Sequence, residues 1–286
     1  MENLKRNTSL DRAIVLGGGG ITAIGWEVGI IKGLLESKVD LYKTNMIFGT
    51  SAGAFVGVAL SSGYDIDKLF LAQFKPGETE ISTTATKEIM DAWYEAFMIG
   101  GNDRQRVGAA FGKIAKLNPE PVPASQRQLV VNDRLVTTTW PATLKITAID
   151  ADTGELNVFD HTSEISLADA VTASGAVPGV WPLVKFKNKQ WIDGGMVSSS
   201  NVLLSGEYKK VLVLAPMPQG YGSIPGVRED AEAMKANTDI YIVVPDQESI
   251  DAIGSNPYDP KRRSEAATAG RHQGASIAEA VSAKWQ

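Results

Sequence analysis

Short apolar runs alternate with helical periodicity in the first part of the chain. Residues 13–16 form an apolar run of the length of a buried strand, and residues 46–48 form a second one. Between residues 24 and 35, apolar side chains recur every three to four positions, which is typical of one helix face. Residues 52–60 continue as an apolar helix. This order of elements predicts an α/β fold with a mainly parallel sheet.

The strand pattern disappears between about residues 65 and 124 and then returns. Helical spacing marks residues 87–99 and 109–117, and this helical insertion is interpreted either as a lid over a site or as a structural layer. Further strands are predicted at these segments: 144–149, 157–160, 190–192, 211–214 and 240–244. Asp152-Thr153-Gly154 predicts a hairpin between the first two of them.

The C-terminal segment, residues 259–286, is predicted to be helical. Asp259 followed by Pro260 is a favourable helix start, and the helix reaches Trp285. Gly270 and Gly274 are expected to weaken it. Since no linker divides the sequence cleanly, residues 1–286 are predicted to form one domain.

Composition narrows the classes of function. The net charge is −5 and no basic block is present, which argues against nucleic-acid binding. Cysteine is absent, which excludes disulfides and cysteine-ligated metals. The first 13 residues are polar, without the apolar segment of a signal peptide, and residues 52–60 are too short to span a membrane. A cytoplasmic protein is therefore predicted.

The pentapeptide Gly49-Thr50-Ser51-Ala52-Gly53 fits the G-x-S-x-G nucleophile elbow. An apolar strand precedes it and an apolar helix follows, so Ser51 is expected on a sharp turn at a helix N-terminus. Small neighbours allow such a strained turn. Taken alone, the motif is equally compatible with a glycine-rich turn in an unrelated α/β protein.

The glycine run that follows the first strand supports two interpretations. The backbone N–H groups of Gly18, Gly19 and Gly20 are accessible because no side chain covers them, which suits an oxyanion hole. The same run, residues 17–20, suits a pyrophosphate and predicts, as the alternative, a dinucleotide-binding protein. Glu36 or Asp40 would then bind the ribose.

A nucleophilic serine needs a base. The chain has two histidines, His161 and His272, and both are interpreted as ordinary surface residues. A triad of Ser51, Asp193 and His272 is disfavoured because only two strands precede the elbow. Asp193 ends an apolar strand, and two glycines follow it, so it is the candidate to act directly on Ser51. Partial burial is expected to raise the pKa of this weak base.

Together, the glycine run, the G-T-S-A-G elbow and the Asp193-Gly194-Gly195 motif resemble the patatin-like phospholipases from about residue 12 to 216. The segment 173–182 is also similar to the family's stretch before its D-G-[GA] motif, and residues 259–274 are similar to bacterial members. One departure is that residues 21–23, Ile-Thr-Ala, lack the basic residue that many members carry after the glycine loop.

The resemblance implies a three-layer α/β/α fold and hydrolysis of lipid acyl esters without a metal or cofactor. Ser51 and Asp193 would form the catalytic dyad, and the backbone of residues 18–20 would form the oxyanion hole. A lipid or fatty-acyl ester is therefore the expected partner, with a possible transient contact to a membrane surface. Lys261, Arg262 and Arg263 with Trp285 are candidates for that contact, although a solvated helix face is the simpler interpretation. A catalytically silent lipid-binding protein is a further alternative.

Overall fold

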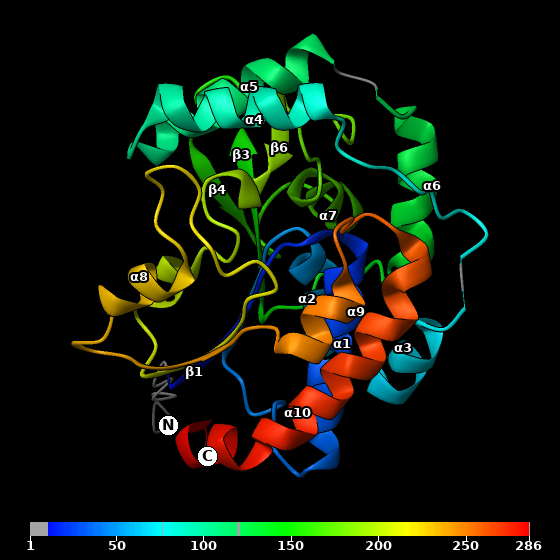
Figure 1. The fold of residues 1–286 in the computed structure, drawn as a ribbon, viewed down its shortest axis with the longest axis vertical. Coiled ribbons are helices and arrows are strands. Elements are labelled where there is room, and N and C mark those ends of the chain that lie inside the picture. Colours follow the sequence, from blue (N-terminus) through cyan, green and yellow to red (C-terminus); the bar gives the residue numbers. More distant parts are fainter. Residues whose placement is uncertain (1–10, 76, 119–120, 286) are drawn as a thin grey trace, which may run out of the picture.

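The computed structural model describes residues 11–285 except 76 and 119–120. Most of the polar N-terminal segment, on which the prediction of a cytoplasmic protein depends, lies outside the described residues. A mixed sheet with the strand order β5-β6-β3-β2-β1-β7-β8 forms the centre, and β4 pairs with β3 (Figure 1). The strands are β1 (Arg12–Leu16), β2 (Met46–Gly49), β3 (Leu144–Asp150), β4 (Leu156–Phe159), β5 (Val184–Phe186), β6 (Lys189–Asp193), β7 (Lys210–Leu214) and β8 (Asp239–Val243).

The parallel part of the sheet is centred on β1, which pairs with β2 on one side and with β7 on the other. Its side chains alternate between the two faces, as strand geometry requires. Ile14 and Leu16 pack into one apolar cluster, whereas Ala13 and Val15 pack into another. Both faces of the sheet are therefore covered, and the predicted three-layer α/β/α architecture is confirmed.

One layer contains the helices that follow the first strands. It comprises α1 (Gly20–Glu36), α2 (Ala52–Ser61), α7 (Leu167–Ser174) and α10 (Arg263–Trp285), with α3 (Ile66–Ala72) and α9 (Gln247–Ile253) beside them. The opposite layer contains α5 (Arg104–Leu117), η2 (Val202–Ser205) and α8 (Val227–Glu232), and α4 (Lys87–Gly100) packs on α5. Figure 1 shows α4 and α5 side by side above the ends of β3 and β6.

The helical stretch between α2 and β3 is longer than predicted. The helix expected over residues 87–99 is confirmed as α4, but α5 begins at Arg104 because Asp103 caps it through the backbone N–H groups of Gln105 and Arg106. A further helix, α6 (Ala124–Arg134), runs up to the connection into β3. This last helix supplies charged side chains to the region around Ser51.

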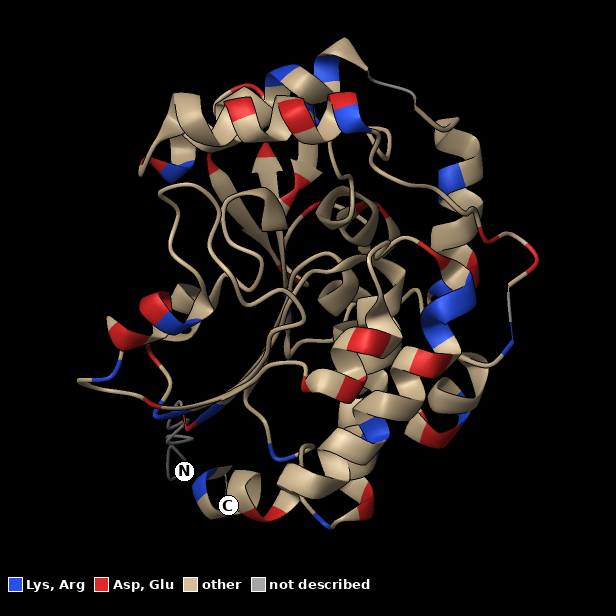
Figure 2. Ribbon diagram, viewed as in Figure 1, with Lys and Arg blue, Asp and Glu red and all other residues tan. Residues whose placement is uncertain are grey.

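The hairpin predicted around residues 152–154 is confirmed, because β3 and β4 pair antiparallel. At the C-terminal segment, Asp259 caps a 3₁₀ turn, η3 (Pro260–Arg262), and α10 begins only after this turn. None of the described helices is both long enough and apolar enough to cross a bilayer. Lys and Arg are interspersed with Asp and Glu along the helices in the view of Figure 2.

Candidate active site

Ser51 lies on the sharp turn that joins β2 to α2. Its backbone has φ 54° and ψ −113°, a conformation that is strained for a residue with a side chain. The turn requires a close approach at Gly53, where an added Cβ would lie 2.1 Å from the carbonyl oxygen of Leu16. The small residues of the motif are thus explained by direct contact between α2 and the end of β1.

Two hydrogen bonds hold this strained turn in place. The backbone N–H of Ser51 donates to the hydroxyl of Ser174 over 2.8 Å, and that of Thr50 donates to the carbonyl of Leu16 over 3.0 Å. Ser174 is the last residue of α7 and is buried. No local sequence pattern indicates this role of Ser174, although the residue belongs to the segment that resembles the family.

Asp193 ends β6, where it pairs with Ala148 of β3. The side chain accepts a 2.7 Å hydrogen bond from the Gly195 N–H and is 2% exposed. Burial raises the pKa of Asp193 to about 7, while interactions with the Ser51 side chain, the Gly195 N–H and Arg127 act in the opposite direction. The predicted rise in the pKa of this carboxyl is confirmed, and its cause is nearly complete burial.

A buried asparagine connects the two halves of the site. Asn201 has a left-handed backbone, and its side-chain amide donates to Thr50 Oγ1 at 3.1 Å and to the Gly194 carbonyl at 3.1 Å. The hydroxyls of Thr50 and Thr147 are also 2.9 Å apart. Nothing in the local sequence indicates this role, because the partners are far apart along the chain.

The N–H groups of the glycine loop after β1 differ in whether they already donate a hydrogen bond within the protein. The N–H of Gly18 already donates to the Ser199 carbonyl over 2.7 Å, so it is not free to bind a substrate oxygen in this conformation. Gly19 immediately precedes α1, and Gly20 is its first residue. Among the described residues, no acceptor is bonded to the N–H groups of these two glycines. Gly20 has φ 72°, and an added Cβ would lie 2.3 Å from the Pro257 carbonyl oxygen.

A cavity of about 300 Å³ opens on Ser51 and Asp193. The apolar side chains of its lining include Met90, Trp93, Tyr94, Phe97, Met196 and Met217. The first four belong to α4, so this helix of the insertion lines the cavity. A wall of methionine and aromatic side chains fits a flexible hydrocarbon chain.

The two histidines lie away from this cavity. His272 is on α10 with a largely exposed side chain, and its Nδ1 lies 2.9 Å from Glu248. His161 is exposed, and neither histidine belongs to the cavity lining. Their interpretation as surface residues is confirmed.

The acids proposed for ribose binding are wrongly placed for the dinucleotide interpretation. Glu36 is the last residue of α1, at the opposite end from Gly20, and 16 steps along a helix correspond to about 24 Å. Glu36 instead forms ion pairs with Lys32 and Arg271. Asp40 lies in the connection between α1 and β2. In the described part of the chain, His, Asp and Glu side chains form no group of three or more that would hold a metal ion.

The C-terminal residues considered for membrane contact are mostly engaged within the fold. Arg263 is buried and donates to Glu80 and to the carbonyls of Ala72 and Lys75. Trp285 is buried and donates to the Asp40 carbonyl. Both ideas about this cluster, a membrane contact and a solvated face, are therefore wrong for these two residues.

The segments that carry Ser51 and Asp193 both lie within the region that matches a known family. The sequence model of the family described as Patatin-like phospholipase matches residues 14–204, more than half of the chain. No curated protein sequence matches the chain.

The solved structures that are similar to the chain include one from Legionella pneumophila and one from Pseudomonas aeruginosa. VipD from Legionella pneumophila has a TM-score of 0.48 at 14% identity, over 94% of this chain and 67% of that one. A chain in the crystal structure of full-length SpcU in complex with full-length ExoU, from the type III secretion system of Pseudomonas aeruginosa, has a TM-score of 0.46 at 17% identity. That match covers 97% of this chain and 53% of the other, so this chain spans about half of its length. On the strength of the family match, the chain belongs to the patatin-like phospholipase family.

Proposed function

We propose that this protein is a serine acyl hydrolase that cleaves acyl esters of lipids, with Ser51 as nucleophile and Asp193 as general base. The observation that carries the proposal is the meeting of three features at one point. Ser51 lies on a strained strand-to-helix turn, Asp193 is buried beside it with a pKa raised to about 7, and both line an apolar cavity. Membership of the patatin-like phospholipase family supports the hydrolysis of lipids.

In the first half-reaction, Asp193 takes the proton of the Ser51 hydroxyl while the serine oxygen attacks the ester carbonyl. We assign the developing oxyanion to the N–H groups of Gly19 and Gly20, because the Gly18 N–H is bound to Ser199. The positive end of the α1 dipole supports negative charge at this position. Asp193 then returns its proton to the leaving alcohol as the tetrahedral intermediate collapses.

In the second half-reaction, Asp193 takes a proton from water, and the hydroxide oxygen attacks the acyl-enzyme. The fatty acid leaves, and the Ser51 hydroxyl is restored by the proton on Asp193. A pKa close to neutrality suits both the acceptance and the return of this proton. The acyl chain would occupy the cavity lined by α4.

The proposal is tested by hydrolysis of p-nitrophenyl esters of increasing acyl length. Ser51→Ala and Asp193→Asn should abolish hydrolysis, whereas His272→Ala should retain the wild-type rate. The rate should rise with chain length until the acyl chain fills the cavity. A wild-type protein that is folded but inactive on every ester would favour a silent lipid-binding protein, and an inactive but folded His272→Ala would favour a triad.

A further inference from the structure

A second and smaller space also opens on Ser51. It measures about 20 Å³ and shares Ser51 and Gly20 with the apolar cavity. Its lining differs, because the starts of α1 and α2 and two guanidinium groups, from Arg127 and Arg134, contribute to it. No Asp or Glu is among the described residues that line it. The space therefore has a positive character next to the proposed nucleophile.

Arg127, on α6, is a buried cation without a hydrogen-bonding partner for most of its side chain. It is 3% exposed, and neither Nε nor Nη1 has a partner among the described residues. The guanidinium lies over the ring of Trp181, 4.2 Å from its centroid. A buried charge without a hydrogen-bonded counterion is unfavourable, so an anionic ligand would relieve this cost.

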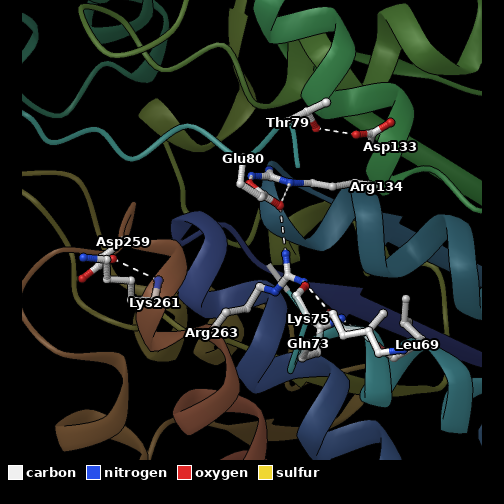
Figure 3. A network of polar contacts seen from close by, with 11 residues as sticks. Leu69, Gln73, Lys75, Thr79, Glu80, Asp133, Arg134, Asp259, Lys261 and Arg263 are labelled. Carbon is white, nitrogen blue, oxygen red and sulfur yellow. Dashed lines mark hydrogen bonds and ion pairs between the residues drawn. The ribbon is translucent and has the colours of Figure 1, made fainter. Parts of the chain in front are cut away.

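The nearest carboxylate is already shared between two other arginines. Glu80 accepts hydrogen bonds from Arg134, with the shortest at 2.5 Å, and from Arg263 at 2.9 Å (Figure 3). Asp133, the residue before Arg134 on α6, accepts instead from Thr79. Three guanidinium groups thus surround a single carboxylate, and Arg127 is the one without an ion pair to it.

The other acidic group that acts on Arg127 is Asp193. Burial, followed by repulsion from Arg134, lowers the pKa of Arg127 to about 9, and Glu80 and Asp193 compensate only in part. The guanidinium remains charged at neutral pH. Since Asp193 itself has a pKa of about 7, it does not supply a permanent counterion.

Arg127 and Ser51 face each other across a glycine. A Cβ placed on Gly175 would lie 3.1 Å from Arg127 Nη2 and 4.0 Å from Ser51 Oγ. No side chain therefore separates the guanidinium from the nucleophile at this position. The N-terminal N–H groups of α1 and α2 add further positive potential to the same space.

We propose that Arg127 is a specificity-determining residue that binds the anionic phosphate of the substrate's leaving group, beside the ester that Ser51 cleaves. The inference rests on the proposed hydrolase function and names a substrate class, acyl esters that carry a phosphate on the same glycerol unit. A space of this size holds one oxygen-sized atom, so one phosphate oxygen would enter and the rest of the head group would remain outside. The apolar cavity would take the acyl chain.

The test compares two substrates with the same acyl chain, 1-acylglycerol 3-phosphate and 1-monoacylglycerol, both kept below their micelle-forming concentrations. Wild type should prefer the phosphorylated ester in kcat/KM. Arg127→Met should reduce this preference by about 10- to 100-fold, the size of a charge-assisted hydrogen bond. The preference is the ratio of the two kcat/KM values, so an effect of the lost charge on Asp193 acts on both substrates and cancels. Arg127→Lys should restore part of the preference, and Lys113→Met, which removes an exposed cation, should leave it unchanged.

A second variant keeps the test decisive if Arg127→Met does not fold. Gly175→Ala inserts a methyl group between Arg127 and Ser51 at a φ of −108°, which alanine readily adopts, and should reduce the same preference. An equal loss on both substrates, or an unchanged preference, would overturn the role of Arg127. Failure of wild type to cleave either lipid would overturn the proposed function and this inference together, whereas equal cleavage of both would overturn the inference alone.

Inorganic phosphate distinguishes a head group from a free anion. With a head-group subsite, phosphate should competitively inhibit cleavage of the phosphorylated ester in wild type and should have little effect in Arg127→Met. If phosphate acts through Arg127 while wild type shows no preference for the phosphorylated ester, the site binds free phosphate and the head-group assignment is wrong.

Discussion

Asn201 donates a 3.1 Å hydrogen bond to the hydroxyl of Thr50, the residue that immediately precedes the proposed nucleophile. The same amide nitrogen donates to the carbonyl of Gly194, the residue that follows the proposed base. One side chain therefore connects the segments of the proposed nucleophile and the proposed base. Because Asn201 is buried, its amide has no water to replace these partners.

Asn201→Gly should impair both stability and turnover. Glycine accepts the left-handed backbone of this position, at φ 52°, so the variant removes the amide without adding backbone strain. The buried carbonyl of Gly194 loses a donor, and the free energy of unfolding should fall by about 1–3 kcal/mol. Misplacement of Ser51 relative to Asp193 should lower kcat by about 10- to 100-fold.

Chemical denaturation and ester hydrolysis measure these two effects. The matched control is Asn188→Gly, since Asn188 also has a left-handed backbone, at φ 58°, but is exposed in the turn between β5 and β6. A wild-type rate in folded Asn201→Gly would show that the amide does not align the site.

The rate of acylation should depend on pH through Asp193. Only the carboxylate accepts the proton of Ser51, and its pKa is about 7. The value of kcat/KM should therefore be low in acid, rise through neutral pH and level off above about pH 8. A pH–rate profile with a soluble short-chain ester measures this, and an inflection at the ordinary pKa of an aspartate would contradict the assignment.

The same carboxyl should make the folded protein less stable as the pH rises. Its pKa is raised on folding, from 3.8 to about 7, so the folded state binds this proton more tightly than the unfolded state. The contribution to stability is complete below about pH 4 and is lost as the pH rises to 7. Asp193→Asn, which stays neutral, should thus be more stable than wild type at pH 8, by up to about 4 kcal/mol.

Urea denaturation of both proteins between pH 4 and 8 tests this sign. The advantage of Asp193→Asn should shrink toward acidic pH. Burial also raises the pKa of Glu27, but this residue is present in both proteins and does not affect their difference. A variant that is less stable than wild type at pH 8 would show that the ionised carboxylate is favourably bound in the fold.

Helix α4 should bring the cavity to a lipid surface. Met90 and Tyr94 line the cavity, yet they remain 50% and 65% exposed. Apolar side chains at the mouth of an acyl site can bury themselves in a bilayer interface. The double variant Met90→Ser with Tyr94→Ser should therefore bind phosphatidylglycerol-containing vesicles more weakly, with an affinity that is reduced about tenfold in co-sedimentation.

Leu117→Ser is the matched control for this experiment, because Leu117 is 87% exposed at the end of α5 and does not line the cavity. Unchanged binding by the double variant, or an equal loss in the control, would remove α4 from the contact.

The parts of the site that are encoded locally could be predicted from sequence. The elbow around Ser51 and the glycine pair after Asp193 are short motifs whose backbone requirements are visible in residue type. Order along the chain also predicted most of the parallel sheet. By contrast, the partners that come from distant segments, such as Ser174, Asn201 and Arg127, have no local pattern and become visible only when the chain folds.

The glycines of α10 show why helix propensity alone gave the wrong expectation for this helix. Gly270 and Gly274 were expected to weaken this helix, but they form its contact with α1. An added Cβ on Gly274 would lie 2.5 Å from the Ile30 carbonyl oxygen, and one on Gly29 would lie 2.2 Å from that of Ala267. Close packing of two helix backbones therefore explains glycines that propensity alone interprets as weak points.

Covalent labelling with a long-chain alkyl fluorophosphonate, mapped by mass spectrometry, is the most direct test of the proposed nucleophile. We predict one adduct per chain, on Ser51, that forms in wild type and is absent in Ser51→Ala. Labelling should slow strongly in Asp193→Asn, because the serine loses its base. An adduct on a different serine, or no adduct on folded wild-type protein, would contradict the claim that Ser51 is the catalytic nucleophile.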